Sequence, residues 1–208
     1  MPVDFDNKFI FVHIPKTAGT SISSILKLQG KRHLHDPTIE GLVTIDTISY
    51  ADQHLTCSLL KKDPRVKNCF DSFFKFTFVR NPYDRFFSTF FWNRSYWKTN
   101  ENTIEVFNKW VDDFKPNTKK DHFLEQNKFI YDDNGKLMVD FVGKVENIEN
   151  DFKTITNMIG LNINNTLPKY NITENKTKYN KDDFLTTANK QKIYELFKKD
   201  FEIFEYKK

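Results

Sequence analysis

The sequence contains little cysteine and no long apolar run, and both absences narrow the possible classes of protein. Only two of its 208 residues are cysteines, Cys57 and Cys69, which supply neither a disulfide framework nor the spacing of a metal site. We therefore expect two reduced thiols in the core. No stretch is long and apolar enough to cross a bilayer, and the N-terminus lacks a basic segment followed by an apolar one. The sequence thus predicts a cytoplasmic protein without a transmembrane segment.

Internal repeats, low-complexity linkers and a strong excess of one charge are also missing. The formal net charge of +4 suits an anionic ligand but is too diffuse to indicate binding of nucleic acid. A length of 208 residues and a hydrophobic content of 38% fit one globular domain, residues 1–208, with a sizeable core. Phenylalanine, at 22 residues, is expected to fill most of that core. These properties leave the oligomeric state open.

The first strong signal spans residues 9–22, where a mostly apolar run is followed by a short polar loop and an amphipathic pattern. The run Phe9–Ile14 is typical of a strand that is buried on both faces, as in a parallel sheet. Ile22, Ile25 and Leu26 then recur at helical spacing. A loop between a strand and a helix directs free backbone N–H groups and the positive end of the helix dipole at an anion, most often a phosphate.

This loop has the composition of a phosphate site but differs from the common ATPase loop. In this loop, Lys16 precedes Gly19, which is the loop's only glycine. In the ATPase loop, the lysine follows the last glycine, and a Mg²⁺-binding hydroxyl residue comes after the lysine. A mobile positive charge and several hydroxyl groups are available to an anion; the alternative is a tight turn with an incidental lysine. The candidate ligand-binding residues are Lys16, Thr17, Ala18, Gly19, Thr20 and Ser21.

The second strong signal lies at residues 73–88. A buried strand is expected first, and Asn81-Pro82 is a favoured start for the next helix. Arg80 then emerges at the C-terminal edge of a central strand, where open parallel sheets bind ligands. Ser88 comes about two helical turns later, so both side chains could reach one anion. The alternative is a capped helix whose Asp84 and Arg85 join a charge network on the surface.

Two residues are candidates for acid–base chemistry. His54 lies between a predicted strand at 42–45 and a helical stretch around 59–60, where a histidine could act as a general base or serve as a capping or core residue. Glu146 comes after a predicted strand at 137–142, and a helix-start or ion-pair role fits it as well as catalysis does. The residues alone leave these alternatives open.

The remaining segments carry coarser structural signals. Asp132–Gly135 predicts the turn of a hairpin formed by strands within 129–142. The aromatic run at 86–92 is expected to serve mainly the core, and the polar stretch 168–179 to form a loop. Helical spacing predicts three further helices, at residues 103–128, 148–159 and 188–204.

Several segments together resemble one family. The loop Pro15–Ser21 (PKTAGTS) resembles the 5′-phosphosulfate loop of sulfotransferases that use 3′-phosphoadenosine 5′-phosphosulfate (PAPS), especially Golgi-type carbohydrate sulfotransferases and their soluble microbial relatives. Residues 80–88 are similar to the family's 3′-phosphate motif, Arg-Asn-Pro-x-Asp-Arg with a following serine. The sequence departs from the family's pattern at Gln53, where a lysine often precedes the matching His54, and at Lys144, where the family has arginine.

The resemblance implies an α/β fold, with a central parallel sheet flanked by helices in a single P-loop-like domain. It also implies an enzyme that moves a sulfuryl group from PAPS to a carbohydrate hydroxyl, releases 3′,5′-adenosine bisphosphate and needs no metal. Lys16 would stabilise the departing 5′-phosphate, and Arg80 and Ser88 would hold the 3′-phosphate. His54 would accept the hydroxyl proton, and Lys176 would contact the nucleotide.

Two other functions are also compatible with the sequence. A nucleotide kinase-like P-loop enzyme would need a Mg²⁺-binding hydroxyl behind the loop lysine and an aspartate at a strand end; Thr17 offers the hydroxyl, but no convincing aspartate accompanies it. A catalytically inactive nucleotide-binding module is compatible with the departure at Gln53. The sequence does not identify the acceptor, and a peptide or a small metabolite is an alternative to a carbohydrate.

Overall fold

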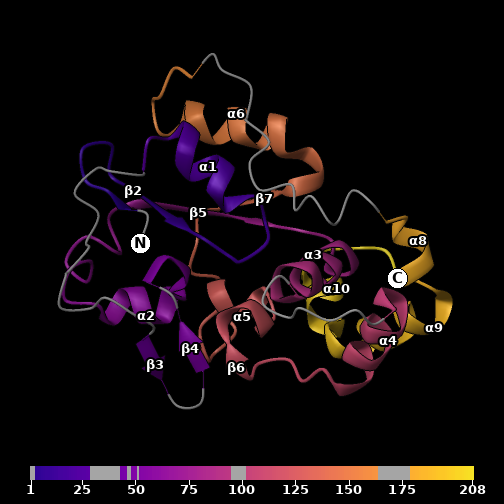
Figure 1. Ribbon diagram of the computed structural model, residues 1–208. Helices are drawn as coiled ribbons and strands as arrows, with labels where there is room; N and C mark the ends of the chain where they lie inside the picture. Colours follow the sequence, from indigo (N-terminus) through magenta and orange to yellow (C-terminus); the bar gives the residue numbers. More distant parts are fainter. Residues whose placement is uncertain (1–2, 29–42, 46–47, 51, 95–101, 164–178) are drawn as a thin grey trace.

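The computed structural model describes residues 3–28, 43–45, 48–50, 52–94, 102–163 and 179–208 (Figure 1). Among these residues, a four-stranded sheet has the order β1-β2-β5-β7. β2, β5 and β7 run parallel, while the short edge strand β1 pairs antiparallel to β2. The sheet is therefore mixed, and the expected parallel arrangement is confirmed for three of its strands. Its members are β1 (Val3–Asp4), β2 (Phe9–Val12), β5 (Phe74–Val79) and β7 (Phe141–Lys144).

A second, smaller sheet brings together two distant parts of the chain. β3 (Val43–Ile45) pairs antiparallel to β4 (Ile48–Tyr50), and β4 pairs parallel to β6 (Lys119–Lys120). Because β4 and β6 are parallel, the short 3₁₀ turns that come after them lie side by side. These turns are η2 (Asp52–His54) and η3 (Asp121–Phe123).

Helices cover both faces of the four-stranded sheet. α1 (Gly19–Ile25) and α6 (Ile148–Met158) lie on one face, and α2 (Cys57–Lys62) and α5 (Asn127–Ile130) on the other (Figure 1). The other described helices pack together beside the sheet as a helical layer. The helical layer consists of α3 (Pro82–Arg94), α4 (Thr103–Asp113), α8 (Lys181–Phe184), α9 (Thr187–Leu196) and α10 (Lys198–Ile203).

The side chains of β2 alternate between two cores, as the sequence predicts for a strand that is buried on both faces. Phe9 and Phe11 pack with α1 and α6, whereas Ile10 and Val12 pack with α2 and α5. All four are at most 1% exposed. Removing this much apolar surface from water is the dominant stabilisation of such a strand, and it holds the loop after β2 in place.

Aromatic side chains fill the helical layer. Phe86, Phe87, Phe90 and Phe91 of α3 are each at most 3% exposed. Their rings meet mainly edge to face, and Phe90 and Phe107 of α4 have centroids 5.0 Å apart at an interplanar angle of 89°. The expectation that this run serves mainly the core is confirmed for these four residues.

The prediction of one helix over 103–128 is wrong beyond Asp113. Phe114 is extended (φ −69°, ψ 134°) and buried, so α4 stops there. Pro116 lies just beyond, where a proline is common after a helix end because it disfavours helical backbone at the residue before it. The chain then enters β6 and η3, which carry side chains of the site described below.

Two other predicted elements are only partly confirmed. The turn at 132–135 is present, with Gly135 at φ 78°, but a single bridge between Tyr131 and Leu137 replaces the predicted hairpin ladder. Downstream, β7 instead joins β5, where its backbone completes the parallel sheet. The C-terminal helix is divided into α9 and α10 at Phe197, whose φ of −123° is not helical.

The structure also describes the two cysteine side chains and the lengths of the helices. Both thiols are free, and burial raises the pKa of Cys57 to about 12, which makes it unreactive. Cys57 is fully buried and Cys69 partly buried. Across the described ranges, each helix is too short or too polar to span a bilayer.

Candidate active site

The two strongest sequence motifs meet at one edge of the four-stranded sheet. β2, β5 and β7 are parallel neighbours, so their C-terminal ends lie side by side. They are followed by the loop at 13–18, by Arg80 and by the 3₁₀ turn η4 (Val145–Asn147). Open parallel sheets bind ligands at this edge. The predicted positions of the phosphate loop and of Arg80 are thus confirmed.

The loop between β2 and α1 has a strained backbone. Lys16 and Ala18 have φ values of 68° and 65°, in the left-handed region that costs a non-glycine residue on the order of 1–3 kcal/mol. The hydroxyl of Thr17 donates to the carbonyl oxygen of Ile14 at 2.8 Å, so this hydroxyl stabilises the loop itself. Strained backbone of this kind persists only where the surrounding structure enforces it, and it is frequent at ligand sites.

Gly19 allows the ring of His13 to lie against the start of α1. A Cβ atom at position 19 would lie 1.9 Å from Nε2 of His13, so a larger residue would displace that ring. His13 stacks on Phe11, with ring centroids 5.5 Å apart, and meets His54 edge-on at 4.7 Å. The glycine therefore permits the packing that joins the phosphate loop to His54.

Lys16 and Arg80 bring two cations close together at this edge of the sheet. Nη1 of Arg80 lies 3.4 Å from the backbone carbonyl oxygen of Lys16. Within the described part of the chain, neither side chain forms an ion pair. Burial, with the charge of Arg80 as a second cause, lowers the pKa of Lys16 to about 8. Two partly buried positive charges at one edge of the sheet favour binding of an anion.

The backbone of Arg80 is held by a buried amide side chain. The N–H of Arg80 donates to Oε1 of Gln126, and Nε2 of Gln126 donates to the carbonyl oxygen of Arg80, both at 2.8 Å. The N–H of Gln126 donates in turn to the buried carboxylate of Asp200 at 2.7 Å. These bonds replace the strand neighbour that the backbone lacks beyond β5, and they keep Arg80 at the sheet edge.

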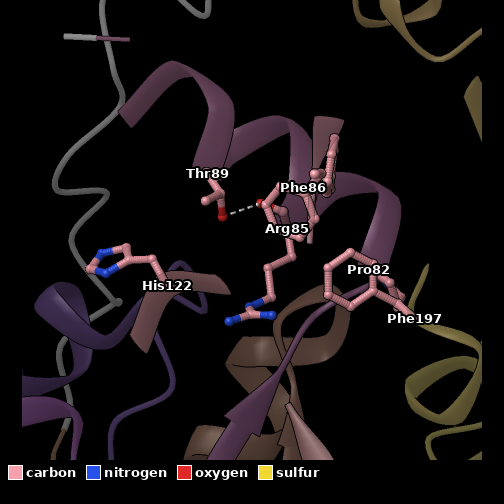
Figure 2. A pocket seen from close by; sticks show the side chains of 7 residues that line it. Pro82, Arg85, Phe86, Thr89, His122 and Phe197 are labelled. Carbon is pink, nitrogen blue, oxygen red and sulfur yellow. Dashed lines mark hydrogen bonds between the residues drawn. The ribbon is translucent and has the colours of Figure 1, made fainter. Parts of the chain in front are cut away.

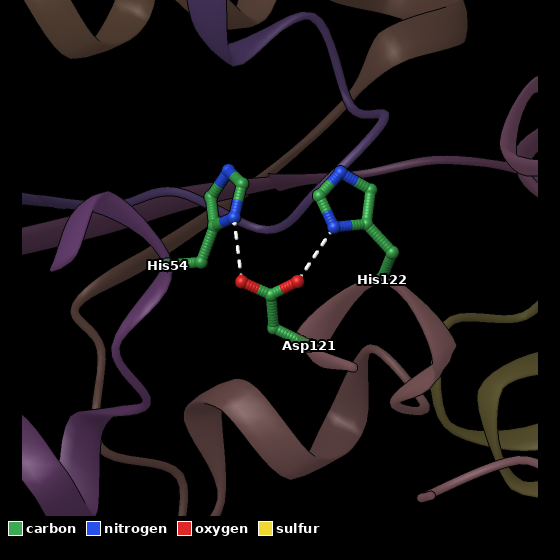
Figure 3. A group of neighbouring side chains, drawn as sticks. All are labelled: His54, Asp121 and His122. Carbon is green, nitrogen blue, oxygen red and sulfur yellow. Dashed lines mark hydrogen bonds and ion pairs between the residues drawn. The ribbon is translucent and has the colours of Figure 1, made fainter. Parts of the chain in front are cut away.

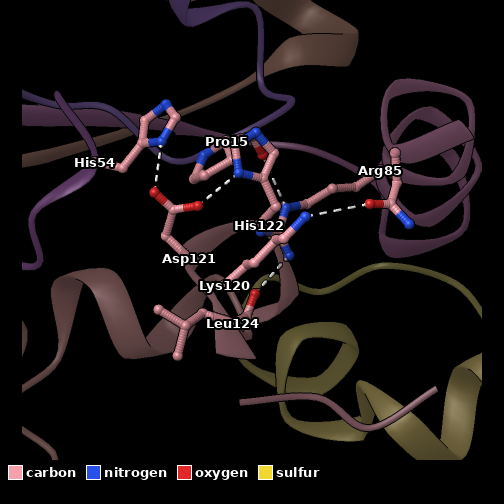
Figure 4. A network of polar contacts seen from close by, with 8 residues as sticks. Pro15, His54, Arg85, Lys120, Asp121, His122 and Leu124 are labelled. Carbon is pink, nitrogen blue, oxygen red and sulfur yellow. Dashed lines mark hydrogen bonds and ion pairs between the residues drawn. The ribbon is translucent and has the colours of Figure 1, made fainter. Parts of the chain in front are cut away.

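Arg85 is buried, so the alternative of a surface charge network is wrong for this residue. Its Nε donates to the carbonyl oxygen of Pro15 at 3.0 Å, and its Nη1 to that of Leu124 at 2.7 Å (Figure 4). Burial lowers its pKa to about 10. Arg85 therefore joins the phosphate loop to the segment after η3.

The remaining nitrogen of Arg85, Nη2, is buried and has no hydrogen-bond partner among the described residues. It borders a cavity of about 10 Å³ between α3, His122 and Phe197 (Figure 2). A cavity of this size has room for about one water molecule. It is far too small for a nucleotide or a sugar, so the substrate site must lie elsewhere.

His54, Asp121 and His122 form a compact cluster beside the loop (Figure 3). Nδ1 of His54 lies 2.8 Å from Oδ2 of Asp121, and Nδ1 of His122 lies 2.5 Å from the other oxygen, Oδ1. The side chains of His54 and Asp121 are each 5% exposed. Trp92 stacks on His122, with ring centroids 3.6 Å apart and an interplanar angle of 5°. The cluster is thus closely packed and nearly inaccessible to solvent.

The charge states within this cluster follow from burial and hydrogen bonding. Burial by itself would raise the pKa of Asp121, but the hydrogen bonds from His122 and His54 lower it far below its usual range. Burial lowers the pKa of His122 to about 4 against the opposing effect of Asp121, and the charge of Lys16 contributes to this decrease. At neutral pH the carboxylate is therefore ionised and His122 is neutral.

Asp121 and His122 were not among the predicted site residues. They lie 67 and 68 positions after His54, in the stretch that was expected to be helical. The only local signal for them is the dipeptide Asp-His shortly after Pro116, where the helical pattern is interrupted. Their ligand-type atoms and those of His54 lie within 4.8 Å of one another, which would also permit a metal ion if both Nδ1 atoms lost their protons.

The other predicted site residues have different surroundings. Glu146 accepts a hydrogen bond from the N–H of Asn81 at 2.7 Å and one from the hydroxyl of Tyr206 at 2.9 Å, so it holds the start of α3. Ser88 lies on α3 with its side chain nearly buried. Lys176 lies outside the described residues.

Ser21 and Thr20 also have known positions, both in the first turn of α1. Ser21 is 6% exposed and Thr20 is partly buried. A second hollow, of about 680 Å³, opens between α4 and β6. Its lining includes Trp110, Asp112 and Lys120, and Lys120 directly precedes Asp121 in the chain. A volume of this order is typical of small-molecule sites.

Comparisons with known proteins agree with this arrangement. The chain is similar to carbohydrate sulfotransferase 11 of Rattus norvegicus and of Mus musculus, each 23% identical over 240 residues. The alignments cover 98% of this chain but 66% of either relative, so the chain spans just under two thirds of their length. It also resembles the crystal structure of mouse sulfotransferase SULT7A1 complexed with PAP, with a TM-score of 0.50 over 96% of this chain and 86% of that one.

At 15% identity, the structural match shows a shared fold and nothing finer. It confirms the expected sulfotransferase-type α/β fold, a sheet flanked by helices. The family profile described as "Sulfotransferase family" matches residues 1–207. The match extends over nearly the whole chain, and the protein belongs to the sulfotransferase family.

Proposed function

We propose that this protein transfers a sulfuryl group from PAPS to a hydroxyl group of a carbohydrate. The observation that carries the proposal is the cation pair of Lys16 and Arg80, which forms no ion pair with the described residues and lies at the edge of the sheet where open parallel sheets bind ligands. Family membership supports sulfuryl transfer. The names of the relatives support a carbohydrate acceptor, and the PAP complex of the mouse enzyme supports a PAPS donor.

In this proposal the two cations have different partners. Lys16 lies in the strained loop before α1 and would bind the 5′-phosphate, with the backbone N–H groups of the loop beside it. Arg80, held at its backbone by Gln126, would bind the 3′-phosphate, together with the hydroxyl of Ser88. An ionised phosphate stabilises the charged form of Lys16, which compensates for the desolvation that lowers its pKa.

The transfer itself is a displacement at sulfur. PAPS supplies the sulfuryl group and a phosphate that leaves with the electron pair of the broken sulfur–oxygen bond. The acceptor oxygen forms the new bond to sulfur, and its proton passes to Nε2 of His54. Lys16 stabilises the charge that develops on the departing phosphate, and a positioned base typically contributes about 10²–10⁴-fold.

The hollow between α4 and β6 is suited to the acceptor. Its volume of about 680 Å³ is enough for a small oligosaccharide unit, and it begins beside Lys120, the neighbour of Asp121. Aromatic, amide, acidic and basic side chains line it together, which offers both apolar contact and hydrogen bonds to sugar hydroxyls.

Nucleotide binding and transfer can be tested separately. Calorimetric titration is expected to give tight binding of 3′,5′-adenosine bisphosphate and much weaker binding of ATP with Mg²⁺. Incubation with ³⁵S-labelled PAPS and a panel of glycans is expected to label a carbohydrate. Preferred binding of ATP with Mg²⁺ would refute the donor, and binding without transfer to any glycan, peptide or small hydroxyl compound would indicate an inactive module.

A further inference from the structure

We propose that Asp121 is a positioning residue that fixes the tautomers of His54 and His122, so that both rings present an unprotonated Nε2 toward the transfer centre. The proposal rests on the proposed function for its catalytic meaning. The hydrogen bonds on which it depends are observed in the structure and do not depend on the proposed function. One carboxylate that holds two imidazoles is the central feature of the cluster in Figure 3.

The tautomers are set by the hydrogen-bonding capacity of a carboxylate. An ionised aspartate has no proton to donate and can only accept hydrogen bonds. Each oxygen of Asp121 lies within hydrogen-bond distance of one Nδ1 atom, at 2.8 Å for His54 and 2.5 Å for His122. Both Nδ1 atoms must therefore carry a proton. In a neutral imidazole the other nitrogen, Nε2, is then an acceptor.

The directions of the rings agree with this role. In Figure 3 both Nε2 atoms point away from the carboxylate and to the same side. His13, from the end of β2, meets the ring of His54 edge-on at 4.7 Å, and the rings of His54 and His122 are 5.1 Å apart. Lys16 lies close enough for its charge to lower the pKa of His122. The charged and titratable groups around His54 are thus Asp121, His122, His13 and Lys16.

Three elements hold the carboxylate in place. The parallel pairing of β4 with β6 places η2 beside η3, which brings Asp121 to His54 from 67 positions away. Trp92 of α3 supports the ring of His122 from one face. Arg85 fixes the segment after η3 through the carbonyl oxygen of Leu124. Such support is what keeps a catalytic base within the narrow range of productive orientations.

The consequence is a base that is ready before the acceptor arrives. The acceptor proton can pass to Nε2 of His54 without rotation of the ring or transfer of the Nδ1 proton. The imidazolium that results is stabilised by the carboxylate at 2.8 Å, which itself stays ionised. Removal of the carboxylate would leave His54 present but free to adopt the wrong tautomer.

The first test needs no enzymatic activity. The chain has five histidines, so protein labelled with ¹⁵N-histidine gives long-range ¹H–¹⁵N spectra that can be assigned with single His→Asn variants. We expect His54 and His122 to show a protonated Nδ1 and an unprotonated Nε2 at pH 7.5. An Nε2–H tautomer for His54 in the unmodified protein would overturn the proposal, whether or not the protein is a sulfotransferase.

The second test compares Asp121→Asn with Asp63→Asn. Asp63 also forms a close ion pair, with Arg65, but it lies outside the cluster. We expect Asp121→Asn to lower kcat at least about 100-fold, to change the KM for PAPS and the affinity for 3′,5′-adenosine bisphosphate less than threefold, and to remove the Nδ1–H signal of at least one of His54 and His122, because the asparagine amide has one accepting oxygen and one NH₂ group that only donates. Asp63→Asn should leave kcat, the KM for PAPS, the affinity for 3′,5′-adenosine bisphosphate and the Nδ1–H signals unchanged. A kcat within threefold of the unmodified value in Asp121→Asn would refute the positioning role.

Two further outcomes separate the alternatives. If Asp121→Asn does not fold, the tautomer of His54 in the unmodified protein still decides the matter. If transfer is lost on dialysis against a chelator and restored by a divalent cation, His54, Asp121 and His122 are metal ligands and the proposal is wrong. Absence of both nucleotide binding and transfer in the unmodified protein would refute the proposed function while leaving the tautomer result valid.

Discussion

Arg80 donates from Nη1 toward the backbone carbonyl oxygen of Lys16 across 3.4 Å, so the two predicted phosphate ligands belong to one site. They come from different strand ends, 64 positions apart in the chain. Their mutual repulsion and shared burial make the unliganded site unfavourable for two positive charges. The negative charges of a doubly phosphorylated nucleotide would compensate for this unfavourable free energy.

Substitution of either cation should weaken nucleotide binding. A hydrogen bond to a charged group contributes roughly 1.5–3 kcal/mol, so Lys16→Ala and Arg80→Ala should each raise the Kd for 3′,5′-adenosine bisphosphate about 10- to 100-fold. Isothermal titration calorimetry measures the change. Lys61→Ala, which removes an exposed lysine paired with Asp71, is the matched control and should leave the Kd unchanged. Equal affinities in all three variants would exclude the pair from the site.

Nucleotide affinity should fall as the pH rises past 8. The pKa of Lys16 is about 8 in the unliganded protein, below its ordinary value of 10.5, and a bound phosphate raises it by favouring the charged form. Binding therefore takes up a proton above pH 8 and loses about tenfold in affinity for each further pH unit. Titrations at pH 7, 8 and 9 measure this slope. Lys16→Arg keeps its charge throughout and should flatten it; an unchanged slope would assign the titration to another group.

His54→Ala should separate binding from transfer. The ring lies with Asp121 beside the loop and is proposed to take only the acceptor proton. We expect a loss of at least about 100-fold in transfer of labelled sulfate, with the Kd for 3′,5′-adenosine bisphosphate within threefold of the unmodified protein. Transfer at the unmodified rate would remove His54 from the mechanism.

Arg85→Met should destabilise the fold without changing Lys16 or Arg80, the residues proposed to bind the nucleotide. It leaves the buried carbonyl groups of Pro15 and Leu124 without their donors, at about 1–3 kcal/mol each. The free energy of unfolding in urea should therefore fall by about 2–6 kcal/mol. Lys61→Met, at an exposed ion pair, should change it by less than about 1 kcal/mol. If Arg85→Met also lowers the free energy of unfolding by less than about 1 kcal/mol, the hydrogen bonds to the two carbonyl groups do not stabilise the loop.

Gly19→Ala should impair transfer through His13. A methyl group at position 19 would lie 1.9 Å from Nε2 of His13 and would push that ring toward His54. We expect at least about tenfold lower kcat, because small displacements near a reacting group are costly. Gly160→Ala is the control: its φ of 71° makes alanine unfavourable by about 1 kcal/mol, but it has open space around it and should keep full activity. Full activity of Gly19→Ala would argue against the contact.

Local sequence patterns predicted the strand–loop–helix units of the site. The apolar runs that became β2 and β5 are buried on both faces, and the capping pair Asn81-Pro82 begins α3 as expected, with Oδ1 of Asn81 accepting from the N–H of Tyr83 at 2.9 Å. Parallel strands must end at the same edge, so these two units alone were enough to predict that Lys16 and Arg80 would lie near each other.

The stretch 103–128 shows where such patterns fail. The prediction extends the helical spacing that begins at Ile104 beyond Phe114 and Pro116, but packing of Phe114 against Phe86, with ring centroids 4.9 Å apart, fixes an extended residue there. The path of the chain at β6 is governed by pairing with β4, a partner 71 positions earlier in the chain. No local periodicity can report a contact of that kind.

The sequence by itself determined the loop at 13–18, the strand end that carries Arg80 and the presence of a histidine suited to proton transfer, because each depends on neighbours within a few residues. Only the tertiary structure decided that Asp121 and His122 meet His54, and that Arg85 is a buried link rather than a surface charge. The reason is that these roles come from strand pairing and burial, which join segments far apart in the chain. Whether His54 can act as a base depends on that second group of residues, since its orientation is set by a carboxylate 67 positions away.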